Sequence, residues 1–304
     1  MSFEHEIKQI ISNKKNTNNI LFKYTWYLKS FSFDYIINIS EFNNKFYIEY
    51  DENNFFIGID NCITYKPNNK KELLNLKNEI YDNHIIISKG KNFENSTKIF
   101  GIIPFNIDTE PSYPWENTPK SIFYIPKILI YKSNNKYYMT FHIKINSNSN
   151  ITKIINEKNK LKKLIEKSQA TEYKKPKLNL EGMKPNKKEY SKIFENYMKS
   201  IKNKDIKKII LSRMKLFNNK NLFNKNYIIK NLDNNCSKFL FEYNKNNYFI
   251  GASPEKLISK KGTKFSTEAL AGSISKNNKN KYRNFLKNKK ELQEHCLVID
   301  DIKN

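Results

Sequence analysis

Lys208 has the residue type and surroundings needed for base chemistry on a small molecule. It stands near the start of an apolar run, residues 206–217, that is expected to form a strand, so its ammonium would lie on or beside a sheet surface. Burial there lowers the pKa of a lysine toward neutrality, which allows it to act as a base. Lys207 would point to the opposite face of the same strand. Residue type alone leaves a solvated lysine as the alternative.

Glu255 is the matching candidate for an acid. It follows Pro254, whose fixed φ limits the directions in which the carboxylate can point. A general acid must hold its proton near neutral pH, so this role requires a poorly solvated pocket that raises the pKa of the carboxyl group. The alternative is a glutamate in an exposed turn.

Small residues are scarce in this chain, yet six of them fall between residues 251 and 272: Gly251, Ala252, Gly262, Ala269, Ala271 and Gly272. Such a cluster indicates that the backbone approaches something closely or adopts positive φ. Tight packing at a sheet bend is the alternative. At its end, Leu270, Ala271, Gly272 and Ser273 offer backbone N–H groups and a hydroxyl, which together can hold a carboxylate. A helix cap would explain the same four residues.

The elements expected to position these residues belong to an α+β fold with a large antiparallel sheet system flanked by helices. Apolar alternation predicts strands between residues 31 and 141, for example at 46–50, 85–87 and 137–143. Helical spacing is found at 150–167 and 188–202, with a loose connection at 168–188 between them. Residues 222–232 are expected to be helical and residues 239–250 to form a hairpin. A strand near Leu257, a turn at Gly262 and a strand into Thr267 precede a last helix from about residue 281. On that helix Glu291 and Glu294 share a face, and Glu291 is expected to be solvated.

Composition limits the classes of function. Hydrophobic residues make up 38% of the 304 residues, which is enough for a packed core. The net charge of +25 suits a polyanionic partner, but the lysines are spread along the chain, so no nucleic-acid partner is expected. Cys62, Cys236 and Cys296 are far apart and indicate neither a zinc site nor a disulfide framework. With no secretory signal and no apolar run long enough for a membrane span, the protein is expected to be cytoplasmic, without a membrane partner.

Four segments in order along the chain resemble the chorismate-binding enzymes, a family that includes isochorismate, salicylate, anthranilate and aminodeoxychorismate synthases. They are Lys-Lys-Ile-Ile-Leu-Ser-Arg at 207–213, Phe-Ile-Gly-Ala-Ser-Pro-Glu at 249–255, Thr-Glu-Ala-Leu-Ala-Gly-Ser at 267–273 and Glu-His at 294–295. A weaker similarity upstream includes Phe-Gly-Ile-Ile-Pro-Phe at 100–105. The resemblance therefore extends over most of the chain, and we expect residues 1–304 to form a single domain that lacks its C-terminal part, with an N-terminal half at 1–186 and a partial chorismate-binding segment at 187–304.

This resemblance implies an isochorismate synthase, an isomerase that converts chorismate to isochorismate with Mg²⁺. By resemblance, Lys208 activates the attacking water and Glu255 protonates the departing ring hydroxyl. Leu270, Ala271, Gly272 and Ser273 bind a substrate carboxylate, although the family more often has threonine in place of Ser273. Glu294 corresponds to a magnesium ligand, and His295 is expected to have a supporting role. The product would feed menaquinone or siderophore synthesis.

Several alternatives stay open at this point. A salicylate synthase shares the lysine and the glutamate, whereas anthranilate-type enzymes usually lack a lysine at the position of Lys208. The family's second metal-binding glutamate and its arginine and tyrosine for the substrate carboxylates cannot be located in this sequence. The chain is therefore expected to be truncated. It would be one half of a split enzyme completed by a separate polypeptide, or a non-catalytic remnant.

Overall fold

The computed structural model describes residues 2–13, 19–51, 54–91, 97–146, 148–169, 175–206, 208–218, 224–244, 247–272, 284–285 and 287–303. These residues form two compact units. Unit 1 comprises Met1–Lys29, Phe42–Asn156 and Leu232–Asn304, and unit 2 comprises Ser30–Glu41 and Glu157–Asn231. That both units belong to a single domain stays a prediction.

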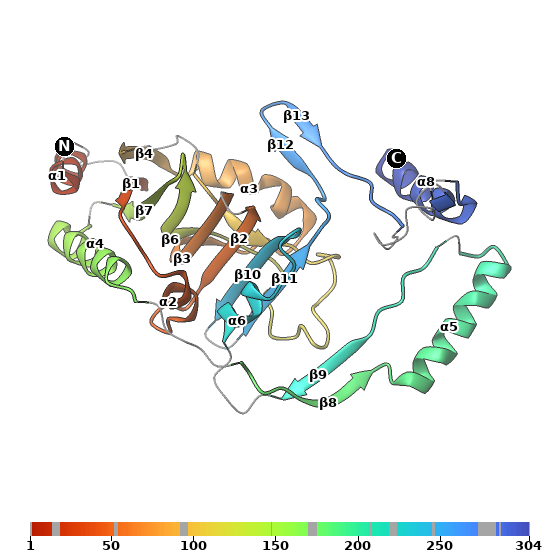
Figure 1. Ribbon diagram of the computed structural model, residues 1–304. Coiled ribbons are helices and arrows are strands. Elements are labelled where there is room, and N and C mark those ends of the chain that lie inside the picture. Colours follow the sequence, from red (N-terminus) through yellow and green to blue (C-terminus); the bar gives the residue numbers. More distant parts are fainter. Residues whose placement is uncertain are drawn as a thin grey trace. The chain divides into compact units, whose positions relative to one another are not determined.

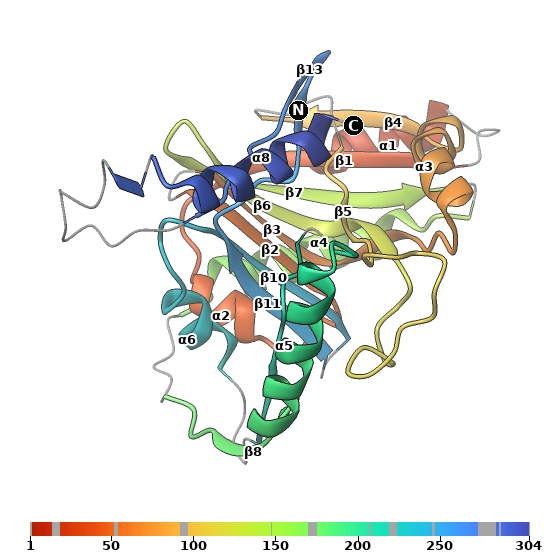
Figure 2. The ribbon, with the colours of Figure 1, turned by 90° about the vertical axis from the view of Figure 1, so that its right-hand side faces the viewer.

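Unit 1 contains a nine-stranded sheet. Eight of its strands follow one another in the order β11 (Asn247–Ser253), β10 (Ser237–Asn244), β2 (Lys45–Asp51), β3 (Asn54–Tyr65), β6 (Ile122–Ser133), β7 (Lys136–Ile145), β1 (Ile20–Leu28) and β4 (Ile85–Gly90), and β5 (Phe100–Ile102) pairs with β6. Every pairing is antiparallel except that of β1 with β4 (Figures 1 and 2). The expected α+β fold with a large, mostly antiparallel sheet is confirmed.

Helices pack on both faces of this sheet. Neighbouring residues of β1 point to opposite faces, and both faces carry apolar side chains. Phe22 is buried against Phe3 of α1 (Phe3–Asn13), with their ring centroids 5.9 Å apart. Leu21, on the other face, packs in a cluster with Leu76 and Ile80 of α3 (Lys70–Asp82). Helix α3 was not expected, since it interrupts a region that the sequence predicts to be mostly strands.

One charged pair is buried inside the sheet. Lys45 of β2 lies opposite Glu242 of β10 in the strand register, and its Nζ is 2.9 Å from Oε2 of Glu242. The two side chains are 0% and 2% exposed. Two charges removed from water in this way are tolerated only when they are paired.

Unit 2 is smaller and mostly helical. It contains α2 (Phe33–Asn38), α5 (Lys187–Lys202), α6 (Lys225–Lys230) and the paired strands β8 (Asn179–Lys184) and β9 (Met214–Asn218), while α4 (Ile151–Glu166) runs across the boundary between the units. Helix α5 begins at a capping box. The Glu189 backbone N–H donates to the Asn186 side chain, and the Asn186 backbone N–H donates to the Glu189 carboxylate.

Two sequence predictions in unit 2 are wrong in detail. Residues 168–188 were expected to be a loose connection, yet they include β8, whose side chains alternate too weakly in hydrophobicity to give a strand signal. The strand expected over 206–217 is limited to β9, because residues 208–213 have no hydrogen-bonded neighbouring strand within the described part of the chain. The helices expected at 150–167, 188–202 and 222–232 are present as α4, α5 and the shorter α6.

The last part of unit 1 follows the predicted order of elements. Strands β12 (Ser259–Lys261) and β13 (Lys264–Ser266) flank a turn at Gly262, which has φ of +61°, and α8 (Lys289–Lys303) follows. Helix α8 starts later than expected, and residues 281–283 lie outside the described residues. Within the described residues no helix is both long enough and apolar enough to cross a membrane.

Candidate functional site

Lys208 lies in unit 2, in the irregular segment between α5 and β9. Its side chain is partly buried and takes part in an interaction with its surroundings. It does not begin a strand as expected, since β9 starts only at Met214. Lys207 lies outside the described residues.

Glu255 lies in unit 1, just after β11. Its backbone is held by Ser253, whose Oγ donates to the Glu255 carbonyl at 3.1 Å and accepts from the Glu255 N–H at 3.4 Å. The side chain itself is exposed. The poorly solvated pocket that a general acid requires is therefore not formed around Glu255 by the described residues.

The loop expected to bind a carboxylate follows β13. At its start the Thr267 hydroxyl donates to the Leu257 carbonyl at 2.7 Å. At its end Gly272 has φ of +84°, which confirms the expectation that the small residues include positions of positive φ. Ser273, the fourth predicted member of the loop, lies outside the described residues.

Helix α8 contacts this loop at two places. The Nε2 atom of His295 lies 3.1 Å from the Ala269 carbonyl oxygen. Glu291 stands beside Gly272, since a Cβ atom at Gly272 would be 2.7 Å from Oε2 of Glu291. Glu291 is therefore partly buried against the loop, and the expectation that it is solvated is wrong. Sequence spacing placed it on the face of Glu294 but could not show that this face meets residues 269–272.

Glu294 lies on α8 between the two residues that contact the loop, and it is partly buried and engaged in an interaction. Carboxylate oxygens of this kind suit Mg²⁺, which is bound by one or two carboxylates together with water and substrate. Among the described residues no group of three or more His, Cys, Asp or Glu side chains is placed to hold a metal ion. Glu294 thus has the chemistry of a single magnesium ligand, and the described residues do not surround it with a full ligand set.

Substituting Gly272 tests the geometry of the loop. Gly272→Ala is expected to lower the free energy of unfolding by more than the roughly 1–2 kcal/mol that a positive φ costs an alanine, because the new Cβ would also lie 2.8 Å from the ring of Phe285. Gly262→Ala is the control, since Gly262 has φ of +61° and, apart from its chain neighbours, no described residue lies within 4 Å of the added Cβ. Urea unfolding of both variants measures the difference, and equal losses would contradict the loop geometry.

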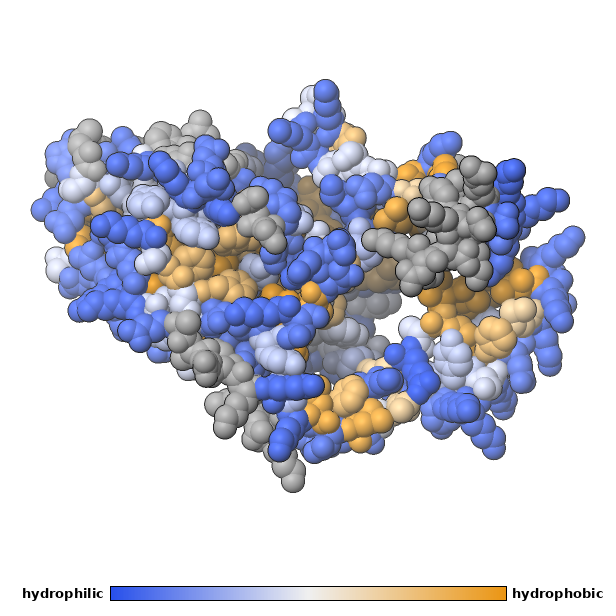
Figure 3. Space-filling model, in the orientation of Figure 1, coloured by the Kyte–Doolittle hydropathy of each residue, from blue (hydrophilic) through white to orange (hydrophobic). Residues whose placement is uncertain are grey.

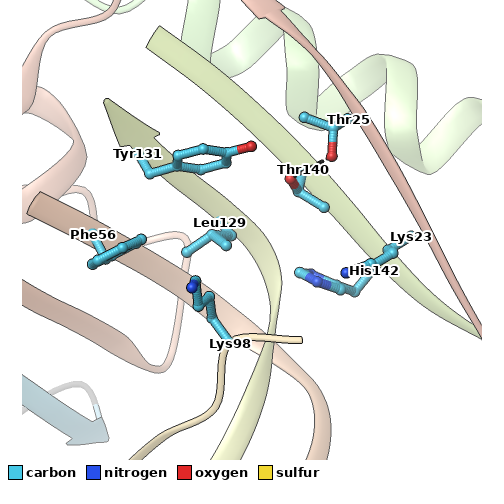
Figure 4. Close-up of a pocket in the computed structure, with 8 residues that line it drawn as sticks. All are labelled: Lys23, Thr25, Phe56, Lys98, Leu129, Tyr131, Thr140 and His142. Carbon is cyan, nitrogen blue, oxygen red and sulfur yellow. Dashed lines mark hydrogen bonds between the residues drawn. The ribbon is translucent and has the colours of Figure 1, made fainter. Parts of the chain in front are cut away.

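A separate polar cluster surrounds a cavity of about 20 Å³ on one face of the sheet of unit 1 (Figure 4). Lys23 and Thr25 of β1 stand opposite His142 and Thr140 of β7, and the two threonine hydroxyls are 2.8 Å apart. Burial, together with the nearby Lys23 ammonium, lowers the pKa of His142 to about 3, so its ring is neutral at pH 7. A cavity of this volume holds about one water molecule. It is too small for a six-membered ring.

The decisive comparison is with protein families. A family model described as chorismate binding enzyme matches residues 5–304. The chain belongs to the chorismate-binding enzyme family. The four segments that resemble this family in sequence all lie within the matched region.

Similar proteins in this family include two isochorismate synthases called MenF. The protein from Haemophilus influenzae is 33% identical over 110 residues, which are 34% of this chain and 26% of the relative. The protein from Escherichia coli is 27% identical over 126 residues, which are 39% of this chain and 29% of the relative. The matched regions thus span less than a third of each relative's length.

Solved structures support the fold. The structure of MenF, the menaquinone-specific isochorismate synthase from Escherichia coli, aligns with a TM-score of 0.66 and 14% identity over 98% of this chain and 67% of that chain. A protein from Bacillus anthracis described as the 2,3-dihydroxybenzoate-specific isochorismate synthase DhbC aligns with a TM-score of 0.54 and 17% identity over 85% of this chain and 58% of that one. At these identities the structures show the shared fold alone.

Large apolar side chains are exposed at the surface of each of the two units of this family member. Helix α5 has no buried residue, and Phe194 is 49% exposed, while Ile210 is 79% exposed. Figure 3 shows apolar side chains gathered over α5 and over the β8–β9 pair of unit 2. In unit 1, Leu257 is 87% exposed and α8 has no buried residue. Exposed apolar surface of this extent is typical of faces that another segment covers.

Proposed function

We propose that the chain acts in the isomerisation of chorismate to isochorismate. The observation that carries this proposal is a lysine, Lys208, in the family's first motif, in a chain that belongs to the chorismate-binding enzymes. Anthranilate-type enzymes usually lack a lysine there. The named relatives are isochorismate synthases, which supports the same choice.

In the proposed reaction one water molecule enters and one leaves. The amine of Lys208 takes a proton from the entering water, whose oxygen attacks one carbon of the substrate ring. Glu255 donates a proton to the hydroxyl that departs from another ring carbon, so that it leaves as water. The backbone N–H groups of Leu270, Ala271 and Gly272, with the hydroxyl of Ser273, hold a substrate carboxylate.

A magnesium ion held in part by Glu294 would neutralise negative charge on the bound substrate. Its remaining ligands would come from a further polypeptide segment, either continuous with this chain or separate. The same segment would cover the exposed apolar surfaces of both units and remove water from around Glu255. We further propose that the protein acts in the cytoplasm without nucleic-acid or membrane partners, and that its product enters menaquinone or siderophore synthesis.

Product analysis tests the reaction. Chorismate and Mg²⁺ are added to the chain, alone and mixed with a polypeptide that supplies the uncovered third of the related structure, with ammonia present in a parallel reaction. Isochorismate as the product supports the proposal. Salicylate with pyruvate would indicate a salicylate synthase, and an aminated product would indicate anthranilate-type chemistry. No turnover in any mixture would overturn the proposal in favour of a non-catalytic remnant.

Glu255→Gln is expected to lower the rate of isochorismate formation by about 10²–10⁴-fold, the contribution of a positioned general acid, because the amide cannot protonate the departing hydroxyl. Glu268→Gln is the control, since Glu268 is also exposed and its ion pair with Lys256 is long, at 3.8 Å. Steady-state rates of the two variants decide the outcome. If both retain wild-type rates, Glu255 is not the acid.

A further inference from the structure

The hydrogen bond between α8 and the loop has a defined direction. A carbonyl oxygen can only accept, so the Nε2 atom of His295, 3.1 Å from the Ala269 oxygen, must bear the proton and donate it. The bond is partly buried, where competition from water is reduced. Because His295 directly follows Glu294 on α8, this bond joins the loop to the residue next to the candidate metal ligand.

A second contact fixes the other end of the loop to the same helix face. Glu291 lies one helical turn before His295, and residues four apart share a face. Its carboxylate lies beside Gly272, whose positive φ turns the backbone against α8. The segment from Ala269 to Gly272 therefore lies against α8 at both ends, with a hydrogen bond at Ala269 and close approach at Gly272.

The contact made just before this segment is weaker. The ion pair of Lys256 with Glu268 has a separation of 3.8 Å, and its side chains are 48% and 51% exposed, so it contributes little to holding the loop. The bond from Thr267 to Leu257 fixes the chain where the loop begins. From Ala269 onward the loop is joined to α8 by the hydrogen bond of His295 and lies beside Glu291 of the same helix, and Gly272 also lies beside the ring of Phe285.

We propose that His295 is a positioning residue. By its hydrogen bond to the Ala269 carbonyl, it keeps the backbone N–H groups of residues 270–272 in a fixed position relative to Glu294. A substrate with two carboxylates would then meet the loop and the metal ligand at a fixed spacing. This inference rests on the proposed function for its link to chorismate, whereas the attachment of the loop to α8 depends only on the contacts above.

Two variants of His295 test the proposal in the full chain. His295→Leu removes the donor, and His295→Gln places an amide N–H close to the original Nε2 position. In His295→Leu, amide hydrogen exchange at residues 269–272 is expected to accelerate about five-fold, the factor corresponding to one hydrogen bond of ordinary net strength. The dissociation constant for chorismate is expected to rise by a similar factor. His295→Gln should restore both values to near wild type.

His84→Leu is the matched control. The ring of His84 also lies within hydrogen-bonding distance of a backbone carbonyl, that of Ile80 at 3.2 Å, and is also partly buried, but at the end of α3. The variant His84→Leu is expected to leave amide hydrogen exchange at residues 269–272 unchanged. Unaltered exchange in His295→Leu, or exchange in His295→Gln as fast as in His295→Leu, would overturn the proposal. Absence of saturable chorismate binding by the wild-type chain would count against the proposed function, while the exchange rates would still decide the role of His295.

Discussion

Replacing Lys208 with methionine is expected to lower the rate of isochorismate formation by about 10²–10⁴-fold, the contribution of a positioned general base. Methionine retains much of the length of the side chain and its partial burial but cannot accept a proton. The loss should appear in kcat and in kcat/KM alike, because the base acts on the attacking water and not on substrate binding. Steady-state rates with chorismate and Mg²⁺ measure it.

Lys207→Met is the matched control for this prediction. The two lysines are adjacent and would point in opposite directions in an extended chain, so only one of them can face the substrate. Lys207→Met is expected to retain near wild-type activity. A large loss in Lys207→Met, with activity kept in Lys208→Met, would transfer the role to Lys207. Wild-type rates in both variants would exclude a lysine base in this segment.

Lys45→Met is expected to lower the free energy of unfolding by about 3–5 kcal/mol, because it removes the ammonium group that pairs with the buried carboxylate of Glu242. Glu242 already raises the pKa of the buried hydroxyl of Tyr124, where desolvation is the larger cause, and that hydroxyl has no hydrogen-bond partner among the described residues. Equilibrium unfolding in urea measures the loss, provided that the slope with denaturant is unchanged.

Two further variants separate the buried charge from the loss of packing. Lys45→Met combined with Glu242→Leu removes both charges and should recover most of the lost stability. Lys120→Met breaks a pair of the same 2.9 Å length with Glu110, whose side chain is 83% exposed, and is expected to cost no more than about 1 kcal/mol. A double variant as unstable as Lys45→Met would show that the cost lies in packing and not in the loss of the ion pair.

Local patterns in the sequence were sufficient for much of the secondary structure. The strands around residues 46–50, 85–87 and 137–143 and the helices at 150–167 and 188–202 depend on alternation or helical spacing among neighbouring residues, and the structure contains all of them. Helix α3 was missed because its apolar residues lie between stretches that alternate. Strand β8 was missed because it is short and exposed, with a bulge near Gly182 in its pairing with β9.

The candidate site was predictable as a set of residues but not as an arrangement. The motif segments identified Lys208, Glu255, Gly272 and Glu294 as candidates, and the positive φ of Gly272 could be anticipated from residue type. For Glu255 the sequence left a buried acid and an exposed turn both open, because its exposure depends on which parts of the chain cover the end of β11. Lys208 and Glu255 belong to different compact units, so their roles stay predictions.

By itself the sequence determined the family, the order of most elements and the residue types available for acid–base chemistry, because each of these depends on short-range spacing and on motifs within a few residues. Only the tertiary structure decided that Lys45 meets Glu242 and that His295 and Glu291 meet the loop at residues 269–272. These contacts depend on strand register and on where a helix packs. Strand register and helix packing are set by the sum of many weak contacts between segments distant in the chain. No single stretch of sequence is therefore sufficient to predict them.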